Sequence, residues 1–475
     1  MEAIMLENLK PERVFYYFEK LTKIPRESGN EKQVSDYLYN LGKSFGYEAF
    51  QDEANNVVIR KPAYKGYEDH APIVLQGHMD MVCEKRDDVV HDFTKDPIEL
   101  VIDGDLIKAN GTTLGADDGI GVAIGLAILE DKNAKHPAVE LLITTDEERT
   151  MAGARAVKSD FIRGRKLINI DTEDEGILFA GCAGGQGIVG NLKVKYVPNE
   201  MKNTFELSLN NLIGGHSGVE IDKDRQNALK LILKALDMVK KVSKIKLVKI
   251  EGGTKHNAIA RDAKVTFCSN EEDYNIDFSK FKEKYPLEKN MNIEIKKIDN
   301  SKNVLCDGCA EKIENTIRDI PHGVYCMIKD KPTIVECSDN FAIVRFDKDM
   351  VKFEVSLRSS NMKTFNEYTK KITDVYEKNS IPYSINDFYK PWEYAKKSDL
   401  RDLAVKTYKE ITNKDMKVTV IHAAVETAIF VDTFSDMEMI AVGPDLKEVH
   451  TPNERLSISS TFRTYEFIKK LIEKL

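Results

Sequence analysis

The sequence predicts an α/β protein of two regions, in which the second region interrupts the first. Two amphipathic helices are expected at the start, because residues 14–24 and 31–46 place apolar side chains at three-to-four spacing. Up to about residue 172, short β-branched runs then alternate with glycine-rich turns and one long helix, which is typical of an α/β sheet. The runs are NNVVIR, PIVLQGH, IGVAIGLAILEDK, VELLITT and KLINIDT.

The alternation of short β-branched runs and glycine-rich turns ends near residue 181, at GCAGGQG, where a second region of strands and helices begins. It contains the strand FELSLNNL, the helix QNALKLILKALDMVKKV, the strand pair IVRFDKDMVKFEVSLRSS and the helix MKTFNEYTKKITDVYEKN. After it, the sequence again resembles the first region, with a helix, a strand and a C-terminal helix predicted at LRDLAVKTYKEIT, MKVTVIHA and TYEFIKKLIEKL. We therefore predict a discontinuous domain of residues 1–186 and 389–475, with a mixed central sheet flanked by helices, and an inserted α+β lid domain of residues 187–388.

The composition excludes several classes of partner. The chain has 475 residues, 42% hydrophobic and 31% charged, and carries a formal net charge of −8 with acids and bases interspersed. No continuous basic field is left for a nucleic acid or an anionic membrane, so neither partner is expected. Residues 1–21 place charges every few positions instead of forming an apolar signal stretch, and no later segment reaches membrane-spanning length. We expect the protein in the cytoplasm.

The cysteines predict no structural framework. Their number is seven, which is odd, and together with the missing export signal it favours reduced thiols. Cys306 and Cys309 have CxxC spacing, but no second CxxC or closely spaced histidine pair accompanies them. We interpret them as an incidental pair.

Side chains suited to chemistry collect at the strand ends of the first region. Four consecutive predicted strands each end in a metal-ligand type or an acid, in PIVLQGHMD, the loop TTLGADDG, LLITTDEE and INIDTED. Ligands of open α/β sheets bind outside the carboxyl ends of the strands, so these residues should share one crevice. Each alone would be an ordinary structural residue, but several buried carboxylates together cost heavily unless cations compensate. The side chains expected there are His78, Asp80, Asp117, Glu147, Glu148 and Asp171.

These ligand types predict a pair of divalent metal ions. Imidazole with carboxylate oxygens suits zinc, manganese or cobalt, and the lack of cysteine ligands argues against a structural zinc site. Two ions about 3.5 to 4 Å apart, joined by a shared carboxylate, hold a hydroxide and polarise a carbonyl, which is machinery for hydrolysis. A dinucleotide loop at GADDGIGVAIG is disfavoured, because G-x-G-x-x-G is absent and the acids would repel a pyrophosphate.

Eight motifs occur in order along the chain: GHMDMV (77–82), TLGADDGIG (113–121), TTDEE (144–148), NID (169–171), GGHSG (214–218), NAIAR (257–261), SLRSS (356–360) and HTPNER (450–455). Together they resemble the Xaa-His dipeptidase (aminoacyl-histidine dipeptidase) branch of the dinuclear-zinc peptidase superfamily, which includes aminoacylases and carboxypeptidases. The resemblance covers essentially the whole chain. It implies hydrolysis of dipeptides by a metal-bridged water, with two divalent ions as cofactors, zinc favoured, and a homodimeric assembly.

The resemblance also assigns roles at the metal centre. Glu147 resembles the general base that passes a proton from the water to the leaving amine, and on a strand it would point away from Glu148. Asp80 resembles the acid that orients the ring of His78. Of the two acids in GADDG, the family spacing selects Asp117 as the bridge and leaves Asp118 to cap the next helix. The implied metal ligands are His78 and Asp171 on one ion, Glu148 and His450 on the other, and Asp117 on both.

In the second region, the resemblance points to substrate contacts. His216 resembles the group that stabilises the tetrahedral oxyanion. Asn257 and Arg358 resemble binders of the substrate backbone and terminal carboxylate, for which a guanidinium is well suited. Gly443 in AVGP is expected to line the pocket.

Three segments depart from the family pattern and leave the side-chain preference open. VEIDKDRQNA follows GGHSG in place of a second histidine and glycines, Ala260 replaces a proline after NAI, and HAAVETA (422–428) replaces a form with glycine and cysteine. The nearest alternatives are an N-acyl amino acid deacylase and an aminotripeptidase of the same superfamily. A silent metal-binding scaffold is a third alternative, against which the retention of Glu147 argues.

Overall fold

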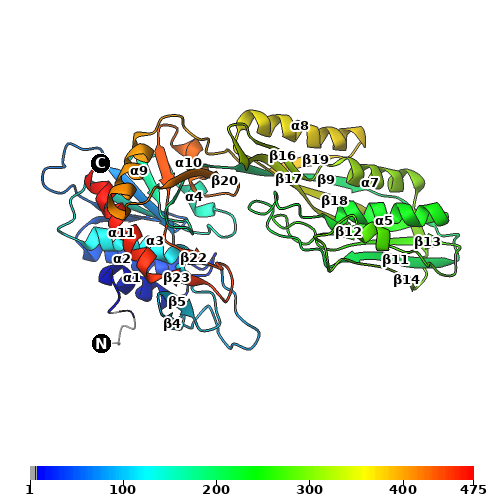
Figure 1. Cartoon of the computed structure of the whole chain (residues 1–475), viewed down its shortest axis with the longest axis horizontal. Coiled ribbons are helices and arrows are strands. Elements are labelled where there is room, and N and C mark those ends of the chain that lie inside the picture. Colours follow the sequence, from blue (N-terminus) through cyan, green and yellow to red (C-terminus); the bar gives the residue numbers. More distant parts are fainter. Residues whose placement is uncertain (1–5, 7) are drawn as a thin grey trace. The chain divides into compact units, whose positions relative to one another are not determined.

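The computed structural model describes residue 6 and residues 8–475, and the chain divides into two compact units (Figure 1). Unit 1 comprises Met1–Cys182, Trp392–Val420 and Val425–Leu475, and unit 2 comprises Ala183–Pro391 and Ile421–Ala424. Residues 1–5 and 7, which belong to the segment expected to lack a signal peptide, lie outside the described residues. Within the described part, none of the helices has the length and apolar character needed to cross a membrane.

Unit 1 is built on an eight-stranded mixed sheet of order β1-β2-β6-β3-β7-β21-β8-β20. Its centre is parallel, because β3 pairs in parallel with β6 and β7, and β21 with β7, whereas β1, β2 and β8 pair antiparallel. β3 and β6 are buried at every position, as expected of near-continuous apolar strands in the middle of a covered sheet. The strands are β1 (Glu48–Gln51), β2 (Val57–Lys61), β3 (Ile73–His78), β6 (Val139–Thr144), β7 (Lys166–Asn169), β8 (Ile177–Cys182), β20 (Lys417–Ile421) and β21 (Glu438–Ala441).

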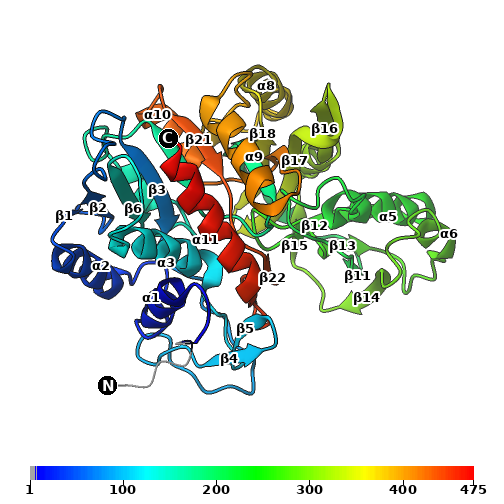
Figure 2. The ribbon, with the colours of Figure 1, turned by 60° about the vertical axis from the view of Figure 1, so that its left-hand side comes forward.

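The helices of unit 1 flank this sheet. α3 is apolar on nearly all sides and correspondingly buried, and it packs against α1, β3 and the C-terminal helix α11 (Figure 2). The predicted α/β class, with a mixed central sheet flanked by helices, is confirmed. The helices are α1 (Glu12–Thr22), α2 (Lys32–Ser44), α3 (Ala116–Glu130), α4 (Ala152–Ala156), α9 (Asp399–Thr412), α10 (Thr427–Thr433) and α11 (Ile458–Glu473).

A second, four-stranded sheet of unit 1 has the order β22-β23-β5-β4. It joins the hairpin of β4 (Leu100–Asp103) and β5 (Leu106–Ala109) to β22 (Leu446–Lys447) and β23 (Arg455–Ser457). The loop between β22 and β23 contains His450, so this sheet holds the C-terminal segment within unit 1.

Unit 2 has a nine-stranded sheet of order β14-β11-β13-β12-β17-β18-β9-β19, with β16 beside β17. Its two halves repeat one pattern: β11-α5-β12-β13-α6-β14, and β9-α7-β17-β18-α8-β19, with mirrored order around the β12·β17 pairing. The first half is inserted between β9 and α7. The elements are β9 (Gly184–Lys193), β11 (Asn203–Asn210), α5 (Ala228–Val242), β12 (Ile245–Gly252), β13 (Ala263–Ser269), α6 (Ser279–Lys282), β14 (Asn292–Ile298), α7 (Asp307–Asp319), β16 (Gly323–Ile328), β17 (Lys331–Asp347), β18 (Met350–Ser359), α8 (Met362–Lys378) and β19 (Tyr383–Tyr389), with the separate pair β10 (Tyr196–Pro198) and β15 (Asn303–Leu305).

Candidate active site

Three parallel strands of unit 1 deliver ligand-type side chains to one edge of the sheet. His78 is the last residue of β3, Glu148 follows β6, and Asp171 follows β7. β6, β3 and β7 are neighbours in register, so their carboxyl ends coincide. Asp117 arrives differently from the prediction. It lies in the first turn of α3, after a loop of residues 110–115, and not at the end of a strand.

The Asp117 carboxylate lies between two imidazoles. Its Oδ1 is 3.1 Å from His78 Nε2, and its Oδ2 is 3.1 Å from His450 Nε2. His78 Nε2 is also 3.6 Å from Asp171 Oδ1, and His450 Nε2 is 2.9 Å from Glu148 Oε2. Two sets of donors thus share one carboxylate, which is the arrangement that a bridging metal ligand requires.

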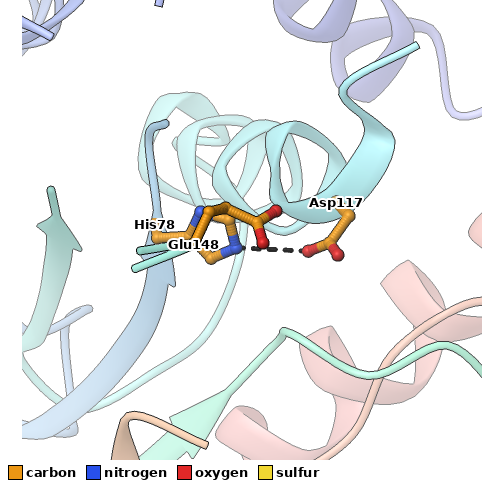
Figure 3. A group of neighbouring side chains, drawn as sticks. All are labelled: His78, Asp117 and Glu148. Carbon is orange, nitrogen blue, oxygen red and sulfur yellow. Dashed lines mark hydrogen bonds and ion pairs between the residues drawn. The ribbon is translucent and has the colours of Figure 1, made fainter. Parts of the chain in front are cut away.

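The donor atoms of His78, Asp117 and Glu148 converge on one point. Figure 3 shows the three side chains turned toward one another, and one ligand atom from each lies within 4.8 Å of the others. This triad contains one predicted ligand of each metal ion, His78 and Glu148, and the predicted bridging ligand, Asp117. The five predicted ligands therefore occupy a single place in unit 1.

Burial makes this group of acids costly without cations. It raises the pKa of Glu148 to about 7, raises the pKa of Asp171 against the opposing effect of His78, and raises the pKa of Glu147 well above its usual range. Burial disfavours a charged His450, yet the carboxylates of Asp117 and Glu148 raise its pKa to about 11. Acids that resist ionisation beside imidazoles that retain protons form a donor set that divalent cations neutralise. The residues present therefore fit a metal centre.

Asp80 connects the His78 ring to the turn that carries the two glutamates. Its Oδ1 lies 3.3 Å from His78 Nδ1 and accepts a hydrogen bond from Glu147 N at 3.1 Å, while its Oδ2 accepts from Glu148 N at 3.3 Å. The expected placement of both glutamates on a strand is wrong. β6 ends at Thr144, and residues 147–150 form a turn that Met151 N closes by donating to Asp146 O at 2.7 Å.

Asp118 has the capping contact that the sequence predicts. Its Oδ1 accepts from Gly121 N at 3.2 Å, and its Oδ2 accepts from His78 N at 3.2 Å. The second contact ties the start of α3 to the end of β3. Asp118 therefore supports the site through backbone groups.

A match to peptidase family M20/M25/M40 spans residues 74–474. The chain belongs to this peptidase family. It is 33% identical to the cytosol non-specific dipeptidase of Escherichia coli K12 over 99% of both chains. The crystal structure of aminoacylhistidine dipeptidase from Vibrio alginolyticus superposes with a TM-score of 0.84 at 30% identity, covering 99% of this chain and 98% of that one. The aminopeptidase PepT of Bacillus cereus shares the fold, with a TM-score of 0.57 at 16% identity and coverage of 98% and 99%.

The family expected from the motifs is therefore confirmed. This protein is a metallopeptidase.

The three side chains predicted in the second region of this M20/M25/M40 peptidase all lie in unit 2. His216 forms a β-bridge with Ala258, and Ser217 N donates to Asn257 O at 2.9 Å, so the GGHSG and NAIAR segments lie side by side. The next residue, Gly218, approaches the His422 carbonyl so closely that a Cβ there would stand 2.9 Å from that oxygen. His422 is connected to Arg358 through Ser338.

In unit 2, the buried residues His422 and Ser338 lie beside Arg358, which is partly exposed. His422 Nε2 lies 2.7 Å from Ser338 Oγ, and Ser338 is the cross-strand partner of Arg358. Burial and the neighbouring Arg358 charge lower the pKa of His422 to about 3, so the imidazole is neutral. Among the described residues, Arg358 Nε and Nη1 are buried without a hydrogen-bond partner. Such donors indicate a place for an external polar group.

Gly443 has a packing reason to be glycine. It follows β21, whose extension lies against Asp171 and its neighbours, since Val442 N donates to Asn169 O at 3.0 Å. A Cβ on Gly443 would stand 1.9 Å from Thr172 O. The close approach keeps the AVGP segment beside residues 169–172, which include Asp171.

Several residues of this metallopeptidase site were missed by the sequence analysis. Glu426 is fully buried and accepts from Gln76 Nε2 at 2.6 Å and from Thr144 Oγ1 at 2.7 Å, just behind the strand ends. Its sequence signal was an acid in the apolar run AVETAIF. Glu454 and His422 lay in quoted segments but were given no role, and Arg26 had no signal of its own.

Proposed function

We propose that this metallopeptidase hydrolyses dipeptides at a centre of two divalent ions. The observation that carries the proposal is the Asp117 carboxylate, whose two oxygens face two different imidazoles. Zinc is favoured, and manganese or cobalt suit the same donors. The names of the E. coli and Vibrio relatives supply dipeptides as the substrate class. His78 with Asp171 would hold one ion, Glu148 with His450 the other, and Asp117 would bridge them.

Other residues of unit 1 are proposed to transfer the proton and to orient a metal ligand. Bound at these donors, the two ions would polarise the scissile carbonyl and lower the pKa of a water molecule. Glu147 is the proposed general base, because burial raises its pKa and a carboxyl of raised pKa takes a proton readily and returns it to the leaving amine. Asp80 orients the His78 ring and holds the backbone N–H of Glu147.

Unit 2 is proposed to bind the substrate, as the lid expected at residues 187–388. Arg358 is assigned to the terminal carboxylate, because two of its guanidinium nitrogens are buried and unpartnered among the described residues. Asn257 is assigned to the substrate backbone, and His216 to the oxyanion of the tetrahedral intermediate. Gly443 of unit 1 is assigned to the lining of the pocket.

The cellular setting follows the family. We place the enzyme in the cytoplasm, in line with the word cytosol in the name of the E. coli relative. A homodimer is the assembly that the family resemblance favours. A preference for Xaa-His dipeptides is proposed from the Vibrio relative, whose name specifies aminoacylhistidine substrates.

A substrate panel tests the proposed function. The metal-loaded protein is incubated with dipeptides, including Xaa-His members such as β-alanyl-histidine, and with tripeptides and N-acyl amino acids. Cleavage of dipeptides is expected to exceed that of the other classes. Turnover of N-acyl amino acids alone, or of tripeptides alone, would move the function to a deacylase or an aminotripeptidase. No turnover of any substrate would favour the metal-binding scaffold.

Arg358→Gln is expected to lower kcat/KM for dipeptides by about 10- to 100-fold, because a hydrogen bond to a charged group contributes about 1.5–3 kcal/mol. Loss of the carboxylate contact should appear mainly in KM. The matching test uses a dipeptide whose C-terminal carboxylate is amidated, for which the variant and the parent should differ little. An equal loss on both substrates would show that Arg358 does not bind the carboxylate.

A further inference from the structure

We propose that Glu454 is a positioning residue, which fixes the Asp117 carboxylate between the two metal sites and ties it to the segment carrying His450. The proposal rests on the two-metal centre of the proposed function. It concerns a residue outside the ligand set, which acts through the backbone of one ligand and the chain segment of another.

Glu454 binds a run of consecutive backbone N–H groups. Its side chain is buried, with 2% of the residue exposed. Oε2 accepts from Leu114 N at 2.6 Å and Gly115 N at 2.9 Å, and Oε1 accepts from Ala116 N at 2.8 Å and Asp117 N at 3.3 Å. These N–H groups precede the regular turns of α3, since Asp117 and Asp118 have non-helical backbone angles, and a run of consecutive backbone N–H groups binds an anion. The backbone of Asp117 is therefore held directly by Glu454.

Arg26 holds the same loop from the opposite side. Its Nη2 donates to Gly115 O, while its Nη1 donates to Met79 O at 3.0 Å and Asp80 O at 3.2 Å. Residue 115 is thus bound through its carbonyl by a guanidinium and through its amide by a carboxylate. Arg26 also connects the loop before Asp117 to the segment after His78. The two buried charges compensate each other in a place where either alone would be costly.

Glu454 also anchors the loop that carries His450. The two residues are four positions apart, and Glu454 N donates to Thr451 O at 3.1 Å, which closes a turn between them. β23 begins at the next residue, Arg455, and pairs with β5. His450 has φ 61°, a left-handed conformation that a non-glycine residue keeps only when its surroundings hold it. Glu454 therefore connects, through its carboxylate and its backbone N–H, two proposed ligands that are 333 residues apart in the chain.

A purely structural role for Glu454 makes a different prediction. A helix cap that serves only stability would lower the resistance of the metal-free protein to unfolding and leave the metal affinity of the folded protein unchanged. A positioning role changes how tightly the folded protein binds the ions and how they are coordinated. The two roles are separated by metal titration and by the absorption spectrum of bound cobalt.

The experiment compares Glu454→Gln with Glu448→Gln in the full chain. The glutamine amide would turn an NH₂ donor toward N–H groups that need an acceptor. Glu448 lies in the same segment, is half-exposed and pairs with Arg455 at 2.7 Å, so its change removes the same charge without touching the N–H groups of residues 114–117. Cobalt or zinc binding is measured by equilibrium dialysis, with the cobalt spectrum and the unfolding curve of each metal-free protein.

Glu454→Gln is expected to weaken metal affinity by about 10- to 100-fold and to alter the cobalt spectrum, while Glu448→Gln matches the parent. If Glu454→Gln does not fold, Arg26→Lys replaces it, since a lysine cannot reproduce the guanidinium fork, and the same loss is expected. A parent that binds two ions beside a variant with unchanged affinity and spectrum would overturn the positioning role and leave the proposed function standing. A parent that binds no metal would overturn both.

Discussion

Glu147→Ala is expected to reduce dipeptide turnover by about 10²- to 10⁴-fold, the contribution of a general base, while both metal ions stay bound. Glu147 lies in the turn of residues 147–150, and its backbone N–H is held by Asp80 Oδ1 at 3.1 Å. Truncating the side chain leaves that hydrogen bond in place. It also leaves every proposed ligand intact, so only the proton transfer is removed.

The variant is assayed for kcat at saturating dipeptide and for metal content after dialysis. Glu53→Ala is a matched control, because it removes an exposed glutamate of the same unit from the turn before β2. The control should retain full activity. Loss of metal from Glu147→Ala would reassign Glu147 to the ligand set, and full activity with bound metal would remove it from the chemistry.

His450→Ala is expected to release one of two metal ions and to abolish most turnover. His450 Nε2 lies 3.0 Å from Glu148 Oε1 and 3.1 Å from Asp117 Oδ2, so its loss leaves one ion with carboxylates alone. The His450 side chain is 47% exposed, and its removal should therefore cost little packing energy. The ion held by His78 and Asp171 should stay.

Metal content per chain is the decisive measurement for this variant. His70→Ala serves as the control, since His70 is an exposed histidine of the same unit that lies before β3, with its Nδ1 3.0 Å from Leu475 O. It should bind as much metal as the parent. Two ions bound to His450→Ala would show that the C-terminal segment contributes no ligand.

The sequence predicted those parts of the fold that depend on local pattern. The apolar runs of β3 and β6 and the periodic residues of α1 are sufficient to place these elements, because each pattern is decided within a few turns or residues. The convergence of His78, Glu148 and Asp171 followed from a rule about the carboxyl ends of parallel strands. The same rule included Asp117, although this residue lies at the start of α3, and the resemblance supplied its bridging role and added His450.

What the sequence could not show depends on partners far along the chain. Glu147 and Glu148 were expected on a strand, but the hydrogen bonds that their N–H groups donate to Asp80, with those within the Asp146 turn, place them in a turn. The role of Glu454 exists only because residues 114–117 lie against it in the folded chain. His422 joins Arg358 through Ser338 in the same way. No local pattern contains these contacts.

Metal add-back tests whether this chain cleaves dipeptides with two metal ions. The protein is stripped of metal, and hydrolysis of a dipeptide is followed while zinc, manganese or cobalt is titrated in and bound ions are counted. We predict no cleavage by the stripped protein and full activity as the chain takes up two ions. Undiminished cleavage by the metal-free protein, or full activity with a single ion, would contradict the account.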